Sequence, residues 1–282
     1  MPRKKQRPPG EVRRAAEVVQ PRKGAVAALY VALRLAVLAV LVAQFLNGNF
    51  ENVFLCLLTL VLFLVPSFIE RKIHVDLPDT LEVIILLFIF AAEILGEIQA
   101  YYIMFPYWDT MLHTLNGFLC AAIGFALVDI LNRSERFSIT LSPLFLAITA
   151  FCFSMTIGVL WEFFECLMDQ LFWLDMQKDT VVHAISSVKL DPTGGNTPTG
   201  LGDITDVIVV TADGEQVALG LGGYLDIGLL DTMKDLFVNF AGAVVFSVIG
   251  YFYVKSRGRG RFASRFIPKV EPLPETENAG DA

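Results

Sequence analysis

Six long apolar stretches limit what this chain of 282 residues can fold into. A helix needs about 20 apolar residues to cross the roughly 30 Å of hydrocarbon in a bilayer. The six stretches are near or above that length, and they cover residues 25–45, 53–69, 80–101, 110–131, 141–167 and 232–255. Charged residues make up 18% of the chain, below the quarter or so that is usual in soluble domains. The sequence therefore predicts an all-α integral membrane protein, with a bundle of six transmembrane helices within residues 24–255.

Basic residues are distributed unevenly between the segments that flank these stretches. One group of segments is rich in them, and beyond the basic tail of residues 1–23 it contains Arg71, Lys72, Arg133, Arg136, Arg257, Arg259, Arg261 and Arg265. The other group contains only Lys178, Lys189 and, at its edge, Lys234. Because cytoplasmic loops are enriched in basic residues, we expect both termini in the cytoplasm. The tails, residues 1–23 and 256–282, are polar enough that we expect both to be disordered.

The loop between the fifth and sixth stretches is long and changes character along its length. Residues 191–200 are mostly turn-forming, and we expect them to be irregular. Two β-branched runs, residues 206–210 and 216–219, flank the dipeptide Asp213-Gly214, which is the pattern of a β-hairpin. We therefore expect an extracytoplasmic insertion at about residues 182–227 that contains a small β-hairpin.

Acidic residues occur in the outer halves of four predicted helices, at spacings that place each set on one helix face. They are Glu93 and Glu97, then Asp109, then Glu162, Glu165 and Asp169, and finally Asp231 and Asp235. His113 and Asn239 each follow one of these acids by four residues. A charged acid inside a membrane helix costs about 2.5–3.5 kcal/mol on insertion scales, so such a group needs compensation. Shared protons, a metal ion or a cationic substrate would each provide it.

Oxygen ligands combined with one imidazole suit a divalent metal ion, namely Zn²⁺, Mn²⁺ or Fe²⁺, or Mg²⁺ with fewer protein ligands. We predict Glu162 as a general base and four residues as metal ligands, namely Asp109, His113, Glu165 and Asp235. Nearby candidates are Glu93, Glu97, Asp169, Asp231 and Asn239. The alternative is that polar residues at helix ends cap the helices in headgroup water, which applies most to Asp109, Asp169 and Asp231.

Three motifs along the chain carry a resemblance to a known family. They are Trp108-Asp109-Thr110 with His113 and Gly117, Trp161-Glu162 with Glu165, Asp169, Met176 and Gln177, and Asp231-Thr232-Met233 with Asp235, Leu236 and Gly242. At these residues the chain resembles the YjdF-like family of bacterial inner-membrane proteins, whose biochemical function is unassigned. The similarity runs from about residue 33 to residue 253 without most of the outer loop. The resemblance implies a multi-pass protein of the bacterial inner membrane.

A second, more distant resemblance rests on fewer residues. Asp109 with His113, and Asp235 with Asn239 and Gly242, are similar to the VanZ-like membrane family, which is linked to glycopeptide resistance. Neither family supplies an established catalytic residue, so both resemblances bear on the architecture.

Three functions are open at this point. A metal-dependent membrane enzyme would use a metal-bound water as its nucleophile. A proton- or cation-coupled transporter would use the acids as its coupling site, although they occupy one mouth only and no inverted repeat is evident. A non-catalytic membrane scaffold would recruit a partner through the outer hairpin. The lipid bilayer is the expected partner, a nucleic acid is not expected, and protein partners are left open.

Overall fold

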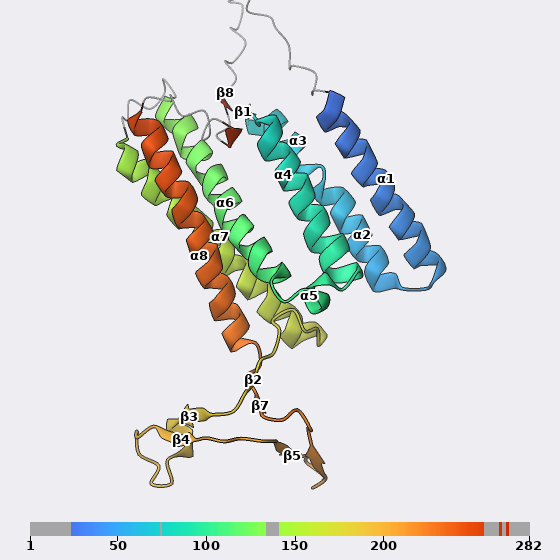
Figure 1. Ribbon diagram of the computed structural model, residues 1–282, viewed down its shortest axis with the longest axis vertical. Coiled ribbons are helices and arrows are strands. Elements are labelled where there is room, and N and C mark those ends of the chain that lie inside the picture. Colours follow the sequence, from blue (N-terminus) through green and yellow to red (C-terminus); the bar gives the residue numbers. More distant parts are fainter. Residues whose placement is uncertain (1–23, 74, 134–140, 257–264, 267–268, 271–282) are drawn as a thin grey trace, which may run out of the picture. The chain divides into compact units, whose positions relative to one another are not determined.

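The computed structural model describes residues 24–73, 75–133, 141–256, 265–266 and 269–270. The predicted tail of residues 1–23, Arg136 and most of the predicted tail of residues 256–282 lie outside these residues. The described chain is mostly helical, with short strands between the helices (Figure 1). Its α-helices are α1 (Gly24–Leu46), α2 (Phe50–Leu62), α3 (Val65–Ile73), α4 (Asp79–Phe90), α5 (Tyr101–Met104), α6 (Trp108–Arg133), α7 (Pro143–Phe172) and α8 (Leu229–Lys255).

Five helical segments of the described chain are long and apolar enough to cross a membrane. They match five of the six predicted spans, and they are Gly24–Leu46, Phe50–Phe68, Trp108–Asp129, Pro143–Phe172 and Leu229–Lys255. Large apolar side chains such as Leu35, Phe54 and Phe237 are exposed on these helices. Exposed apolar surface on this scale is stable in contact with lipid and unfavourable in contact with water.

The third predicted span, residues 80–101, is divided into two helical pieces. α4 has 12 residues, and the π-helix η1 (Ala91–Ile98) follows it directly with 8 residues. At the end of η1 the N–H of Gln99 donates to the carbonyl of Ile94, five residues earlier, which is the π-helical bonding pattern. The chain then turns at Ala100, whose φ of 57° is left-handed, and enters α5. Neither piece alone has the length of a membrane span.

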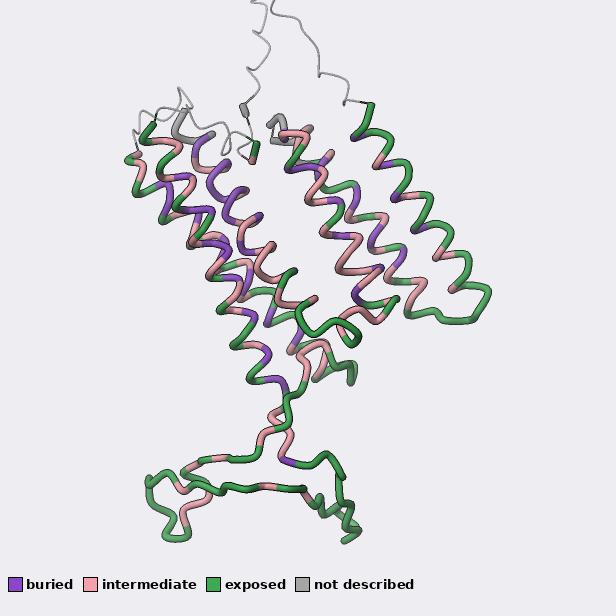
Figure 2. The backbone as a smooth tube through the Cα atoms, in the orientation of Figure 1, coloured by how far each residue is buried: buried purple, intermediate pink, exposed green. Residues whose placement is uncertain are grey.

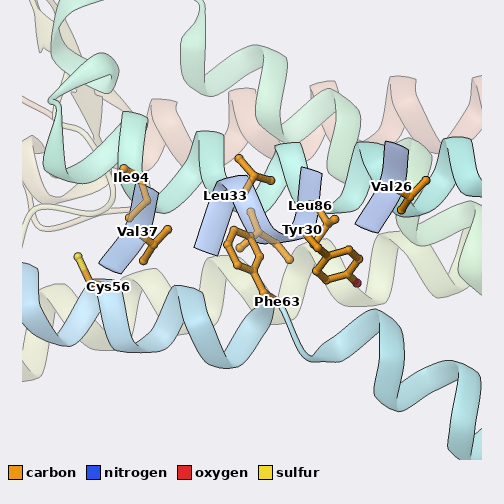
Figure 3. Packing of buried hydrophobic residues seen from close by; sticks show 9 residues of the cluster. Val26, Tyr30, Leu33, Val37, Cys56, Phe63, Leu86 and Ile94 are labelled. Atoms are coloured by element: carbon orange, nitrogen blue, oxygen red, sulfur yellow. The ribbon is translucent and has the colours of Figure 1, made fainter. Parts of the chain in front are cut away.

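The chain divides into two compact units, and the first of them contains Met1–Leu112, Ala122–Ala150 and Ser247–Ala282. A hydrophobic core in this unit joins α1, α2, α4 and η1 (Figure 3). Its buried residues are Val26, Tyr30, Leu33, Val37, Cys56, Phe63, Leu86, Ile89 and Ile94. The four that belong to α1 recur every three or four residues, so one face of that helix is buried. The first unit also contains an antiparallel pair of strands, β1 (Val75–Asp76) with β8 (Lys269–Val270).

The second unit contains His113–Ala121 of α6 and the segment Phe151–Phe246, which includes most of α7 and α8. Glycines allow α6 and α8 to approach closely in this unit. A Cβ atom at Gly117 would lie 2.0 Å from the carbonyl oxygen of Asn239, and one at Gly242 would lie 2.0 Å from the carbonyl oxygen of Thr114. On the other side of α6, the hydroxyl of Ser154 on α7 donates a 2.7 Å hydrogen bond to the carbonyl of Gly117. Small residues therefore lie at the contacts between these helices.

The segment between α7 and α8 extends away from the ends of these two helices and forms three antiparallel pairs of strands (Figure 1). The pairs are β2 (Val181–Val182) with β7 (Tyr224–Leu225), β3 (Ile185–Ser187) with β4 (Thr199–Leu201), and β5 (Ile208–Val210) with β6 (Gln216–Ala218). β5 and β6 are joined through Gly214, whose φ of 86° suits the predicted turn. Of the stretch that the sequence predicts as irregular, residues 191–198 join the 3₁₀-helix η2 (Val188–Leu190) to β4, whereas Thr199 and Gly200 belong to β4 itself. Most of this segment is exposed (Figure 2).

Candidate metal centre

One imidazole and three carboxylates from three helices converge in the second unit. Nδ1 of His113 on α6 lies 3.8 Å from Oε1 of Glu162 on α7, and its Nε2 lies 3.8 Å from Oδ2 of Asp235 on α8. Ligand atoms of His113, Glu162 and Glu165 all lie within 4.8 Å of one another. Glu162, Glu165 and Asp235 are only 4%, 7% and 1% exposed. The structure thus brings together four of the residues that the sequence singles out.

Helix geometry explains why these side chains meet. Glu162 and Glu165 are three residues apart, so they share one face of α7. His113 faces Asp235, and further along both helices the ring of Phe118 meets the ring of Phe246 at 5.1 Å. α6 and α8 therefore run parallel, and the polar residues near their N-terminal ends lie at the same level.

Two further side chains contact the cluster. Nζ of Lys234 lies 2.7 Å from Oδ1 of Asp231 and 3.6 Å from Oδ1 of Asp235. The indole N–H of Trp161 donates a 2.7 Å hydrogen bond to Oε1 of Glu165. A donor of this kind orients a carboxylate, as residues around metal ligands commonly do. The sequence offers Lys234 as a positive partner for the acids at this depth, whereas it gives Trp161 only as part of a motif and does not indicate its contact with Glu165.

Asp169 and Asp231 anchor a short segment of the loop after α7, residues 176–178, which we call the strap. The backbone N–H groups of Met176 and Gln177 donate to the two oxygens of Asp169 at 2.6 and 2.8 Å. The N–H of Lys178 donates to Oδ2 of Asp231 at 2.9 Å. These two acids, which the sequence includes among the nearby candidates, thus connect the strap to the ends of α7 and α8.

Two acids beside the strap have shifted pKa values of opposite direction. Partial burial opposes the charged form of Asp226, but the N–H groups of Thr180 and Leu230 donate to this carboxylate and lower its pKa. Partial burial first, and then the neighbouring carboxylates of Asp175 and Asp226, raise the pKa of Asp179. The loop next to the candidate centre is therefore crowded with negative charge.

Asn239 lies one turn after Asp235 on α8, and its side chain links α8 to α6 and α7. Nδ2 of Asn116 on α6 donates to Oδ1 of Asn239 at 3.2 Å, and Nδ2 of Asn239 donates to Sδ of Met155 on α7 at 3.6 Å. Asn239 is 1% exposed. Asn116 follows His113 by three residues and Asn239 follows Asp235 by four, so this pair lies one turn deeper than the histidine. Asn116 is a residue that the sequence reading missed.

The remaining predicted residues belong to the first unit. Asp109 lies one helical turn before the histidine on α6, and Glu93 and Glu97 lie on η1. Within that unit the indole N–H of Trp108 donates to the carbonyl of Ala91 at 3.3 Å, which connects the start of α6 to the start of η1.

The five candidate spans indicate a membrane protein with several apolar helices. A family model described as a predicted membrane protein (DUF2238) matches residues 29–256. The chain therefore belongs to this family, of which YjdF is a member, and the predicted resemblance to the YjdF-like proteins is confirmed. Comparisons with curated proteins and with solved structures give no match. The resemblance to the VanZ-like family stays a prediction.

Proposed function

We propose that this protein binds a divalent metal ion at His113, Glu162 and Glu165, with Asp235 facing the other ring nitrogen of the histidine, and that it is a metal-dependent enzyme of the bacterial inner membrane. The observation that carries the proposal is the convergence of an imidazole and three buried carboxylates from three helices. Oxygen ligands with one imidazole are a donor set that Zn²⁺, Mn²⁺ and Fe²⁺ accept. Carboxylates and a histidine on facing helices are also a common way to build metal sites in helical bundles.

The distances between the side chains support an ion between them. A hydrogen bond would bring the imidazole nitrogen to about 2.7–3.2 Å from a carboxylate oxygen. Both histidine–carboxylate distances are 3.8 Å, which is longer. Two atoms that each bind one ion at about 2.0–2.2 Å are separated by roughly 3–4.4 Å, so the spacing between Nδ1 of His113 and Oε1 of Glu162 suits shared coordination.

The geometry also refines the roles of the residues. The sequence-based assignment has Asp109, His113, Glu165 and Asp235 as ligands and Glu162 as a general base. Glu162 lies as close to Nδ1 of the histidine as Asp235 lies to Nε2. In metal sites one imidazole nitrogen binds the ion, and the other faces a group that orients the ring. We propose Nδ1 as the binding atom together with Glu162 and Glu165, while the carboxylate of Asp235 faces the opposite ring nitrogen, Nε2. A divalent ion there would supply a metal-bound water as nucleophile.

Metal content of the purified full-length protein in mild detergent is the test of this proposal. We expect about one divalent ion per chain, and we expect His113→Ala and Glu162→Gln each to lower the affinity by about 10–100-fold or more. Glu215→Gln makes the same chemical change at an exposed acid of the loop and should leave the affinity unchanged. Wild-type protein that elutes as a single folded species and binds no divalent ion would exclude the metal centre.

A cation- or proton-coupled transporter is the second candidate, and one observation favours it. Lys234, Asp235, His113 and Glu162 form a row in which basic and acidic groups alternate. Such rows of ionisable groups occur in the proton paths of membrane transporters. Uptake into proteoliposomes that depends on Glu162 would favour transport over chemistry at a fixed ion. Protein that shows neither binding nor uptake would leave the third possibility, a membrane scaffold.

For the membrane topology, we propose six spans with both termini in the cytoplasm. α4 and η1 follow one another without a break, and together they would form the third span. In this arrangement the loop insertion at about residues 182–227 lies outside the cytoplasm, and residues 1–23 and 256–282 are cytoplasmic tails.

Accessibility of single cysteines checks this topology. In a variant whose four native cysteines are replaced by alanine, Asp213→Cys is expected to react with a membrane-impermeant maleimide in intact spheroplasts. Ser256→Cys, just after α8, should react only after lysis. Equal labelling of both positions in intact spheroplasts would contradict the proposed arrangement.

A further inference from the structure

Lys234 stands between two carboxylates at the candidate metal centre. Its ammonium group lies 2.7 Å from Oδ1 of Asp231 and 3.6 Å from Oδ1 of Asp235. The other oxygen of Asp235 faces His113, and Asp235 itself is 1% exposed. A buried carboxylate of this kind needs a positive partner to remain charged. Lys234 provides one from the protein's own chain.

The lysine is also able to leave this position. Its side chain is 44% exposed, while the side chain of Asp235 is 1% exposed. A lysine ammonium is carried on a flexible four-carbon stem and is strongly hydrated, so it moves into water with little rearrangement of the backbone. The carboxylate of Asp231 ties Lys234 down on one side, and the same carboxylate accepts the N–H of Lys178 in the strap.

We propose that Lys234 is a specificity-determining residue that acts as a built-in counter-ion of the cluster, whose charge a divalent cation at the centre replaces and Na⁺ or K⁺ does not. This inference rests on the proposed metal centre. A monovalent ion that replaced the ammonium group would exchange one positive charge for one, and would gain nothing in Coulomb energy. A divalent ion interacts about twice as strongly with the same carboxylates at the same distance. The tethered lysine therefore sets a threshold that only the higher charge exceeds.

An ordinary ion pair between Lys234 and Asp231 is the competing explanation. These residues are three apart on α8, and exposed pairs at this spacing contribute little to stability. If that were their whole role, removal of the lysine charge would not open the centre to Na⁺, and the response of Mn²⁺ binding to Na⁺ would stay as in the wild type. The two explanations thus differ in what they predict for cation binding.

Binding of Mn²⁺ to the purified full chain tests the inference, with choline chloride exchanged for NaCl at constant ionic strength. We expect Lys234→Gln to bind Mn²⁺ about tenfold or more tightly than the wild type in choline chloride. We also expect Na⁺ to weaken this binding in Lys234→Gln and to have little effect in the wild type. Lys234→Arg keeps the positive charge and should resemble the wild type, and Lys189→Gln removes a lysine of the outer loop as a matched control. Should the Gln variant fail to fold, Lys234→Met, which keeps the apolar stem, takes its place.

The outcomes separate the two proposals. Mn²⁺ binding that is equal in the wild type and in Lys234→Gln, with the same response to Na⁺, overturns the counter-ion role and leaves the metal centre intact. Weaker binding in Lys234→Gln overturns it as well, because the lysine would then assist the ion. Absence of Mn²⁺ binding in every variant overturns both proposals, whereas binding by Lys234→Gln alone supports both.

Discussion

Substitution of Gly117 or Gly242 by alanine is expected to destabilise the second unit more than the same substitution at any other glycine of that unit. The new Cβ atom would lie 2.0 Å from a backbone carbonyl oxygen, of Asn239 in the first case and of Thr114 in the second. Backbone atoms of packed helices cannot rotate away as a side chain does, so α6 and α8 must separate. Overpacking typically costs about 1–3 kcal/mol, and a clash with the backbone of the neighbouring helix puts these variants at or above the upper end. Unfolding in mixed SDS micelles measures the effect.

Two other glycines serve as controls for this prediction. A Cβ atom at Gly24, in the first turn of α1, has nothing within 4 Å, so Gly24→Ala should leave the stability unchanged or slightly raised. A Cβ atom at Gly158 would meet Nδ2 of Asn239 at 2.6 Å, which is a side-chain atom that is able to shift, so an intermediate loss is expected. An unfolding midpoint for Gly117→Ala that equals the wild-type value would show that the helices do not pack as closely as described.

Separation of the two helices would also reach the candidate metal centre. His113 lies four residues before Gly117 on α6, and Asp235 lies four residues before Asn239 on α8. A shift of the helices at their contact would move the histidine away from Asp235. Any Gly117→Ala protein that folds is therefore expected to bind metal more weakly than the wild type.

The membrane spans could largely be predicted from the sequence, because hydropathy over about 20 residues reports directly on burial in lipid. The exception is the stretch of residues 80–101. Composition does not reveal a change in the hydrogen-bonding register, and here α4 gives way to the π-helix η1 at Ala91. The ring of Tyr102 occupies the space beside Gly96 of η1, where a Cβ atom would meet it at 2.3 Å, and this contact is also visible only in the structure.

The short strands of the loop show a different limit. The hairpin of β5 and β6 has alternating β-branched residues and an Asp-Gly turn, so its pattern is readable. β2 and β7 have two residues each, and β3 and β4 have three, which is too short for any periodicity to appear. Their partners lie 12–44 positions away in the chain, as between Ser187 and Thr199 or between Val181 and Leu225, and sequence spacing alone does not indicate such pairing.

For the candidate site, polar residues at helical spacing inside apolar stretches were the useful signal. They indicated that four residues lie at a similar depth in their helices, namely His113, Glu162, Glu165 and Asp235. The structure brings these four together. The depth of a residue in its helix did not indicate which carboxylates accept backbone N–H groups instead of facing the histidine. Asp169 accepts two N–H groups of the strap, and this partner depends on how the loop after α7 folds back.

Asn116 was missed although a signal was present. Asp109, His113, Asn116 and Cys120 follow one another at spacings of four, three and four residues, so all of them lie on one face of α6. The thiol of Cys120 donates to Oδ1 of Asn116 at 3.4 Å, which continues the polar row deeper into the helix contact. An asparagine within an apolar stretch draws less notice than an acid, because its insertion is less costly and it is often taken for a packing residue.

The second large effect is expected at Asn239, whose replacement by alanine should lower both the stability and the metal affinity. Its amide joins Asn116 of α6 to Met155 of α7, and the residue is 1% exposed. An interhelical hydrogen bond in a membrane protein contributes about 0.6–1.7 kcal/mol, and truncation of a buried side chain adds the energy of a cavity. We expect a total loss of about 2–4 kcal/mol in SDS unfolding. Because Asp235 lies one turn earlier on α8, a looser helix should also weaken metal binding.

A double-mutant cycle with Asn116→Ala separates the hydrogen bond from the cavity. Each single variant leaves the other amide without its partner, and a buried polar group that loses its partner is more costly than the loss of both groups together. The double variant should therefore be more stable than the sum of the two single losses implies, by about 0.6–1.7 kcal/mol. Metal affinity offers the second readout, since a purely local packing defect would lower the stability and leave Mn²⁺ binding unchanged. Strict additivity together with wild-type Mn²⁺ affinity would show that the Asn116–Asn239 pair does not position Asp235.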